Sequence, residues 1–187
     1  SRLTYQFNFA PNSLQDPAEL EALILEQDQI TKVSPASIYF IQVEGDYQNF
    51  FTRNNLLQVY GIDPEGSVID LVYQDGTGWD EDPTREGIVI AIPISEQLGL
   101  NAGDDMSFFI SGQRVTREVI GVDRNGFDQS LMLWDDLAQL AGTVSGAPRP
   151  NEYAFLARLE GRTLPVAVVG LDETMLNFLL SEEMDTE

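Results

Sequence analysis

Cysteine and histidine are both absent from the 187 residues of this chain. Without cysteine, disulfides, thiol nucleophiles, thiolate metal sites and iron–sulfur clusters are excluded. Without histidine, serine triads with a histidine base, histidine zinc sites and histidine proton shuttles are excluded as well. The sequence also contains no Ser-x-x-Lys spacing and no glycine-rich phosphate loop. Carboxylates, hydroxyls, tyrosine and arginine are the groups left for chemistry.

Positive charge is scarce. Ten Lys and Arg oppose 31 Asp and Glu, so the formal net charge is −21, and Lys32 is the single lysine. We expect no nucleic-acid partner, because phosphate contacts need clustered Lys and Arg, and an anionic bilayer surface is disfavoured for the same reason. Hydrophobic residues make up 43% of the chain, which is enough for a packed core. The length suits one domain or two small lobes.

Long apolar runs are absent too, since none reaches the roughly 18 residues that a membrane-spanning helix requires. The longest runs, over 88–94 and 164–169, have the length of strands. The chain opens at Ser1 directly in a strand-like pattern. We expect it to be a segment of a longer or processed protein, whose membrane segments would lie elsewhere.

Both ends of the chain combine strand and helix patterns. In order, the expected elements of the first part are a strand over 3–9, a helix from Asp16 to about residue 29 with Pro17 in its first turn, a strand over 38–43, and a short helical or irregular piece over 50–57. Those of the last part are strands over 153–159 and 165–169 and a helix that begins at Asp172.

The middle of the chain is rich in short strands and turns. Its expected elements are a turn over 63–66, an exposed acidic loop over 75–82, strands over 88–90, 106–110, 115–122 and 131–134, a helical turn over 95–98 that Gly99 ends, a hairpin turn at Ser111 and Gly112, a helix from Asp135 to Leu140, and a linker over 143–150. We therefore predict an α+β fold of two lobes. A split βαβ-type lobe, residues 1–62 and 148–187, would complete itself around an inserted, mostly-β lobe, residues 63–147.

Several segments of the middle part occur in a familiar order. They are Glu86-Gly87-Ile88-Val89-Ile90, then residues 94–104 with the sequence ISEQLGLNAGD, then Val119-Ile120-Gly121-Val122, and finally residues 131–140 with the sequence LMLWDDLAQL. This order resembles the extracytoplasmic domain of FtsX/MacB-type ABC transporter permeases. Pro93 departs from the strand-to-helix step of that family, and the acidic loop over 75–82 has no counterpart in it.

The resemblance implies a Porter-like split lobe and a Sabre-like inserted lobe between the first two membrane helices of a permease. It also implies a domain at the cell membrane, on the extracytoplasmic side, that is no enzyme and has no catalytic residues, cofactor or metal. A cytoplasmic ABC ATPase subunit or domain would drive the membrane helices. The domain would pass that motion to a substrate or to a partner such as an adaptor, a lipoprotein or a cell-wall hydrolase. A dimer of permeases is part of the same expectation.

Two other functions stay open from the residues alone. The oxygen ligands of Asp75, Asp80, Glu81 and Asp82 could hold Ca²⁺, as could Asp123, Asn125 and Asp128, although neither set has the EF-hand order and each is more typical of a solvated loop or turn. In the second set we expect Gly126 at a positive φ. A free-standing acidic module that binds Ca²⁺ or carbohydrate is therefore one alternative. A glycoside hydrolase with a carboxylate pair is the other.

The two tryptophans differ in their sequence surroundings. Trp134 ends a predicted strand, and we expect its indole to fill the core. Trp79 lies in the polar, acidic stretch over 75–82, where an exposed indole would be available to a partner protein. Trp79 is therefore the candidate contact residue of the chain.

Overall fold

The computed structural model describes residues 2–9, 22, 24–26, 30–50, 52–126, 129–142, 152–160 and 167–169. The predicted linker over 143–150 and the predicted C-terminal helix lie outside these residues. So does most of the predicted helix from Asp16, of which Ala22, Ile24 and Leu25 are described and helical.

Strands and short helices make up the described part of the chain. In chain order they are β1 Arg2–Phe9, β2 Ile30–Val43, β3 Leu56–Ile62, β4 Tyr73–Gly76, β5 Ile88–Ala91, α2 Ile92–Leu98, β6 Asp105–Ile110, β7 Gln113–Asp123, β8 Gln129–Leu133, α3 Trp134–Leu140, β9 Glu152–Glu160 and β10 Ala167–Val169. The fold is α+β, as the sequence predicts.

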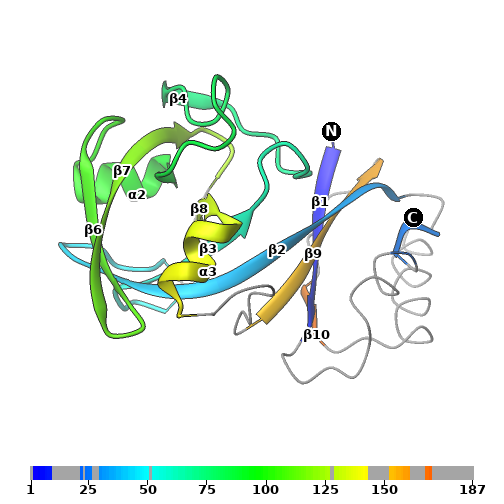
Figure 1. The fold of residues 1–187 in the computed structure, drawn as a ribbon, viewed down its shortest axis with the longest axis horizontal. Helices are drawn as coiled ribbons and strands as arrows, with labels where there is room; N and C mark the ends of the chain where they lie inside the picture. Colours follow the sequence, from blue (N-terminus) through cyan, green and yellow to red (C-terminus); the bar gives the residue numbers. More distant parts are fainter. Residues whose placement is uncertain are drawn as a thin grey trace.

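Six of the strands close into a ring. Its order is β2, β3, β8, β5, β7 and β6, and β6 pairs back with β2. The β3–β8 and β5–β7 pairs are parallel, and the other pairs of the ring are antiparallel. Because each strand of a closed ring has a partner at both edges, the ring leaves no free edge of its own. Figure 1 shows the ring with α2 and α3 against it.

A second, open sheet extends from one strand of the ring. Its order is β10, β1, β9 and β2, with β1 and β10 parallel and the other pairs antiparallel. The long strand β2 serves both sheets, since Ile30 to Ile38 pair with β9 while Ser37 to Gln42 pair with β3. In Figure 1 this strand runs from the ring across to β1 and β9. The two regions are thus joined by one continuous strand.

The interior of the ring is an apolar core. Along β6, Met106, Phe108 and Ile110 are buried and point inward, whereas Ser107 and Phe109 alternate with them and point outward. Ile94 of α2 and Leu137 of α3 are fully buried in the same core. Each of these two short helices therefore covers part of the ring with one apolar side.

A second apolar cluster covers part of the other sheet face. Ile38 of β2 and Tyr60 of β3 point to that face, where Val68 and Trp79 from the chain after β3 pack on them. The backbone N–H of Val68 donates a hydrogen bond to Oγ of buried Ser34, at 3.0 Å. The segment after β3 is thereby held against the first half of β2.

The strands expected near both ends and in the middle of the chain are confirmed, with bounds that shift by a few residues. Two strands were missed. Residues 50–57 were expected to be helical or irregular, but β3 begins at Leu56, and β4 occupies part of the expected acidic loop. The first half of β2 was missed as well, because Pro35 is typical of a strand end. Here Pro35 lies opposite Phe155 within the ladder.

The turn chemistry is largely as expected. Gly99 ends α2 at φ 65°, Pro93 lies in the first turn of that helix, and Ser111 and Gly112 form the hairpin turn at φ 49° and 76°. Asp135 does not cap α3, because that helix already begins at Trp134 and Asp135 lies in its first turn, where a carboxylate favours the helix dipole.

The predicted boundary between two lobes stays a prediction. The strands β2 and β3 belong to the predicted outer lobe, and they hydrogen-bond with β6 and β8 of the predicted inserted lobe. The ring therefore spans the predicted boundary at residue 62.

Candidate interaction surface

Trp79 is buried, not exposed. Its side chain is 5% exposed, and its indole Nε1 donates a hydrogen bond to the carbonyl of Arg85 at 2.9 Å. Its backbone N–H donates to the hydroxyl of Tyr73 at 3.3 Å, and burial raises the pKa of that tyrosine. The sequence suggested an exposed indole because the neighbours of Trp79 are polar. An indole in this position has almost no surface to offer a partner.

Trp134 likewise differs from its expected place. It is the first residue of α3 instead of the end of a strand, and it is half-buried. Gly61 of β3 lies against it, since a Cβ on that glycine would be 3.3 Å from Cα of Trp134.

Two of the four acidic side chains over 75–82, those of Asp75 and Asp82, accept hydrogen bonds from neighbouring groups of the chain. The carboxylate of Asp75 accepts hydrogen bonds from the backbone N–H groups of Gly76 and Ala102, at 3.0 and 2.8 Å. Asp82 accepts from both the N–H and the hydroxyl of Thr84, and these bonds lower the pKa of its carboxyl. Asp80 and Glu81 are exposed. The described residues contain no group of three acidic side chains able to hold a metal ion.

The second set of possible calcium ligands lies in a structural turn, the alternative that the sequence favours. Asp123 is 5% exposed, and its Oδ1 accepts hydrogen bonds from the N–H groups of Val72 and Asn125, both at 3.1 Å. Asp128 lies outside the described residues. Gly126 is not among the glycines at positive φ, which corrects the prediction for this turn. A glycine fits there because a Cβ would lie 3.0 Å from both Ala91 and Asp123.

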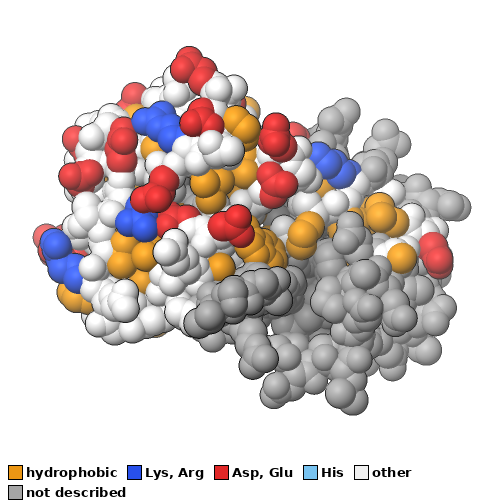
Figure 2. All heavy atoms as spheres, in the orientation of Figure 1, with side chains coloured by type: hydrophobic (Ala, Val, Ile, Leu, Met, Phe, Trp, Pro, Cys, Tyr) orange, Lys and Arg blue, Asp and Glu red, His pale blue; other side chains and the backbone are white. Residues whose placement is uncertain are grey.

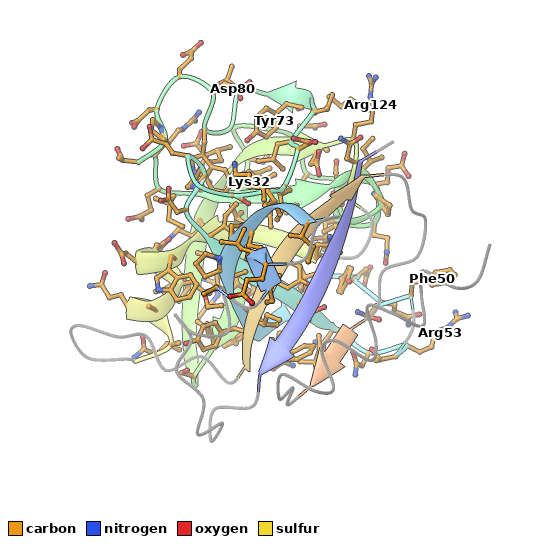
Figure 3. All side chains as sticks on the ribbon, turned by 90° about the vertical axis from the view of Figure 1, so that its right-hand side faces the viewer. Lys32, Phe50, Arg53, Tyr73, Asp80 and Arg124 are labelled. Atoms are coloured by element: carbon orange, nitrogen blue, oxygen red, sulfur yellow. The ribbon has the colours of Figure 1, made fainter. Side chains whose placement is uncertain are left out.

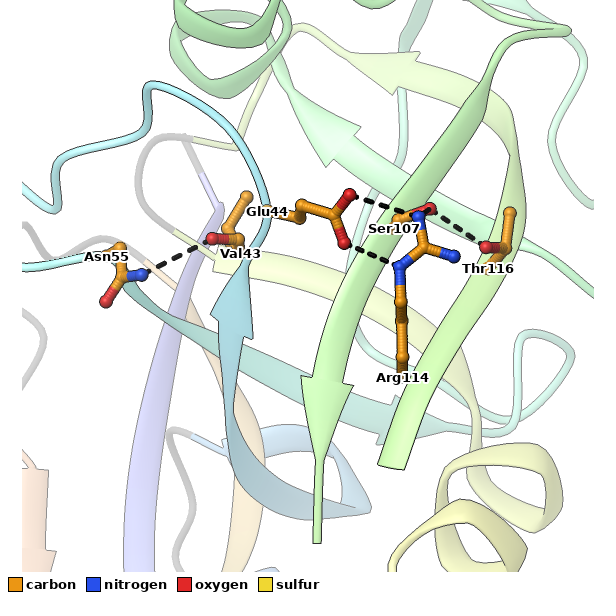
Figure 4. A network of polar contacts seen from close by, with 6 residues as sticks. All are labelled: Val43, Glu44, Asn55, Ser107, Arg114 and Thr116. Carbon is orange, nitrogen blue, oxygen red and sulfur yellow. Dashed lines mark hydrogen bonds and ion pairs between the residues drawn. The ribbon is translucent and has the colours of Figure 1, made fainter. Parts of the chain in front are cut away.

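The seam where β6 closes the ring on β2 carries a polar network (Figure 4). Arg114 of β7 forms a two-pronged ion pair with Glu44, which directly follows β2, at 2.7 and 3.0 Å. Arg114 also donates to Oγ of Ser107, which is 2.8 Å from the hydroxyl of Thr116. The hydrogen bonds from Arg114 hold the pKa of the Glu44 carboxyl below its usual range, and Glu44 in turn raises the pKa of Arg114.

A hollow of about 360 Å³ opens beside this seam. Carboxylates of Glu44, Asp46 and Asp105 line it, together with the apolar side chains of Leu98, Leu100 and Met106 and with Gly45, Gln97 and Ser107. We call it the acidic pocket. Gln97 holds one wall in place, because its side-chain oxygen accepts a hydrogen bond from the N–H of Gln48 at 3.0 Å. The lining of the pocket therefore combines acidic with apolar residues.

Three large apolar side chains are exposed on the outer face of the same seam. Phe40 is 53% exposed, and Leu56 and Phe109 are each 39% exposed. Leu56 and Phe109 lie opposite Gln42 on its two sides, and Phe40 precedes Gln42 by two residues, so all of them share one face. We call Phe40, Leu56 and Phe109 the apolar patch.

The apolar patch is not evident from the sequence pattern. The nearly unbroken apolar run over 38–43 predicts a strand buried on both faces. The signal that was available is Gln42, because an amide two residues after Phe40 indicates a face that ends in solvent. Phe50 is exposed as well, at 61%, on the loop between β2 and β3. Figure 3 shows Phe50 and Arg53 on a different side of the molecule from Tyr73 and Asp80.

Comparisons with known proteins identify the fold. The extracellular domain of the noncanonic ABC-type transporter YknZ from Gram-positive bacteria aligns with a TM-score of 0.51 and 21% sequence identity, over 86% of this chain and 84% of that domain. The periplasmic region of MacB from Actinobacillus actinomycetemcomitans aligns with a TM-score of 0.48 and 17% identity, over 98% and 83%. No protein-family model matches the chain, and no curated protein does.

The structural neighbours are thus extracellular or periplasmic domains of transporter permeases. The resemblance seen in the middle segments of the sequence is confirmed at the level of the fold. Within the residues that the structure describes, no helix is both long and apolar enough to cross a bilayer.

Proposed function

We propose that this chain is the extracytoplasmic domain of an ABC-type transporter permease. The observation that carries the proposal is the alignment with the extracellular domain of YknZ over most of both chains. The absence of Cys and His from the sequence and the engagement of Asp75, Asp82 and Asp123 in turns fit a domain that works through contacts instead of catalysis.

In this proposal the domain passes ATP-driven motion of the membrane helices to a substrate or partner. An ABC ATPase supplies the motion from the cytoplasmic side. The ring moves as one body, because every strand in it is hydrogen-bonded at both edges. The ring bends relative to the open sheet at one point in β2, near Ile38, where the ladder with β9 ends and the ladder with β3 begins. This refines the predicted division into a Porter-like and a Sabre-like lobe.

The gene that encodes this chain offers the first test. We expect a hydrophobic stretch of at least about 18 residues on each side of the chain and a gene for an ATPase beside it. A reading frame that lacks such stretches would contradict the proposed function.

The motion itself is testable with an engineered crosslink in the parent permease. Nζ of Lys32 donates a hydrogen bond to the carbonyl of Ser67 at 3.0 Å, so this pair joins the open-sheet half of β2 to the segment after β3. Lys32→Cys with Ser67→Cys, bridged by a short bis-maleimide, should abolish ATP-driven transport. The chain has no other cysteine, so this is the only bridge that the domain itself can form.

The matched control places both cysteines beside neighbouring ring strands and away from the acidic pocket. Arg85, which precedes β5, pairs with Glu118 of β7 at 2.9 Å, so a bridge between Arg85→Cys and Glu118→Cys restrains nothing that has to move. Transport should survive this second bridge. Equal transport with either bridge would refute the proposed bend in β2.

A further inference from the structure

The apolar patch continues a sheet face that is elsewhere covered. On β2, Ala36 and Ile38 point to this face and lie under the segment with Val68 and Trp79, whereas Phe40 points to the same face beyond the end of that cover. On β3, Tyr60 is likewise covered and Leu56 is not. Exposed apolar groups that extend a buried face are typical of surfaces that another molecule covers.

The acidic pocket borders the apolar patch along β6. Ser107 lines the pocket, and Phe109 follows it by two residues on the same face, which places the two about 7 Å apart along the strand. Glu44 connects them as well, because it lines the pocket and pairs with Arg114, which lies opposite Phe109. The two features therefore form one surface with an apolar part and a negatively charged part.

We propose that this surface binds a basic amphipathic segment of a partner protein. The apolar side chains of the segment cover Phe40, Leu56 and Phe109, and a neighbouring Lys or Arg enters the acidic pocket between Asp46 and Asp105. The inference rests on the proposed function, in which the domain contacts a partner.

The negative charge of the chain favours a basic segment over a second copy of the chain as the molecule that covers this surface. Two copies that met through the same surface would bring their acidic pockets together, and each carries a formal charge of −21. On the face shown in Figure 2, acidic side chains are spread over the ring and basic ones are few. A basic segment gains from the same field, which raises its association rate at low salt.

Binding of synthetic peptides by the 187-residue chain tests the proposal without any transport assay. The probes are three fluorescein-labelled 12-residue peptides, which alternate Leu with Lys, Ser with Lys, or Leu with Glu. Fluorescence anisotropy measures the binding of each peptide at two salt concentrations. We expect the Leu–Lys peptide to bind, and the Ser–Lys and Leu–Glu peptides to bind at least tenfold more weakly. Absence of binding, or equal binding of Ser–Lys, would overturn the proposal.

Substitutions then locate the binding. Phe40→Gln with Phe109→Gln should weaken binding of the Leu–Lys peptide at least tenfold. Asp46→Asn with Asp105→Asn should weaken binding of the same peptide and reduce the dependence of that binding on salt. Val72→Gln is the matched control, because Val72 is 44% exposed and lies outside both the patch and the pocket. An equal loss with Val72→Gln would overturn the assigned surface.

Two further outcomes would name another occupant and refute this one. If sedimentation shows a dimer of the chain that Phe40→Gln dissociates, a second copy covers the patch. If Phe40→Gln unfolds the chain at a much lower urea concentration, a segment of the chain itself covers it. Failure of these binding experiments leaves the crosslinking test of the transport role unaffected, so the two proposals fail separately.

Discussion

The ring and the open sheet share the strand β2 but differ in how many pairing partners their strands have. In the ring, β6 closes on β2, and every strand has two partners within the ring. In the open sheet, β10 pairs only with β1 among the described strands, over three residues. A strand with one short ladder is held by few hydrogen bonds, whereas a strand of a closed ring leaves only when the ladders at both of its edges break. The comparison indicates that rigidity resides in the ring and that adaptability resides in the open sheet.

Amide hydrogen exchange tests the difference in stability between the ring and the open sheet. We expect the amide of Val119, in ring strand β7, to exchange only through global unfolding, and that of Val168, in β10, to exchange through local opening. The difference in opening free energy should be about 5 kcal/mol, because local opening costs little and global unfolding costs about 5–15 kcal/mol. Equal protection of the two amides would show that the sheets open as one unit.

Adjacent phenylalanines on β6 separate the inside of the ring from its outside. Phe108 is fully buried in the core and Phe109 is 39% exposed on the apolar patch. Phe108→Ala should lower the free energy of unfolding by about 3–5 kcal/mol, because it removes apolar contacts and leaves a cavity. Phe109→Ala should lower it by less than about 1 kcal/mol. Urea denaturation measures both, and similar losses would mean that the outer face is also part of the core.

The ring was more predictable from sequence than the way in which it closes. Alternation along β6 and β7, with Ser111 and Gly112 between them, indicates a hairpin by local chemistry alone. That β6 also pairs with Gln42 and Val43, more than sixty residues earlier, leaves no local trace. The same reason explains why the apolar patch was missed, since exposure of Phe40 depends on where the segment after β3 ends.

Trp79 shows the opposite failure of local reasoning. Its sequence neighbours are acidic, yet its indole lies in an apolar cluster, where the carbonyl of Arg85 accepts the indole hydrogen bond. Burial of a side chain is set by what the rest of the chain brings to it, and the four acidic residues over 75–82 do not prevent that. The family resemblance came from the middle segments, where spacing of glycines and apolar residues is itself fixed by local turns.

Two glycines at positive φ show how far packing constrains the turns around the ring. Gly78, at φ 51°, lies against the aromatic side chain of Tyr73, and a Cβ on Gly78 would overlap that side chain. Gly112, at φ 76°, has open space around it. Gly78→Ala should cost about 3 kcal/mol, from backbone strain together with overpacking. Gly112→Ala should cost about 1 kcal/mol, from strain alone. Equal costs in thermal or urea unfolding would show that the wall beside β4 yields to the added methyl group.

Arg117 joins the ring wall to α3. Its guanidinium makes two hydrogen bonds to the carboxylate of Asp136, at 3.0 and 2.8 Å, and Asp136 raises the pKa of Arg117. The side chain of Asp136 is only 7% exposed. Arg117→Gln should therefore lower the free energy of unfolding by about 2 kcal/mol, because it leaves a largely buried carboxylate without its cation. An unchanged urea midpoint would mean that the Asp136 carboxylate is satisfied without Arg117.

Arg114 provides the matched case with the smallest expected effect. It makes a similar two-pronged pair with Glu44, but both side chains are about half exposed, so Arg114→Gln should change stability less than Arg117→Gln. The pKa of Glu44 is lowered in the folded chain, so its contribution is present at neutral pH and is lost as the pH falls through the folded pKa of that carboxyl. The stability difference between Arg114→Gln and the original chain should therefore shrink on acidification. A difference that persists at acidic pH would show that Arg114 closes the ring by packing instead of by its charge.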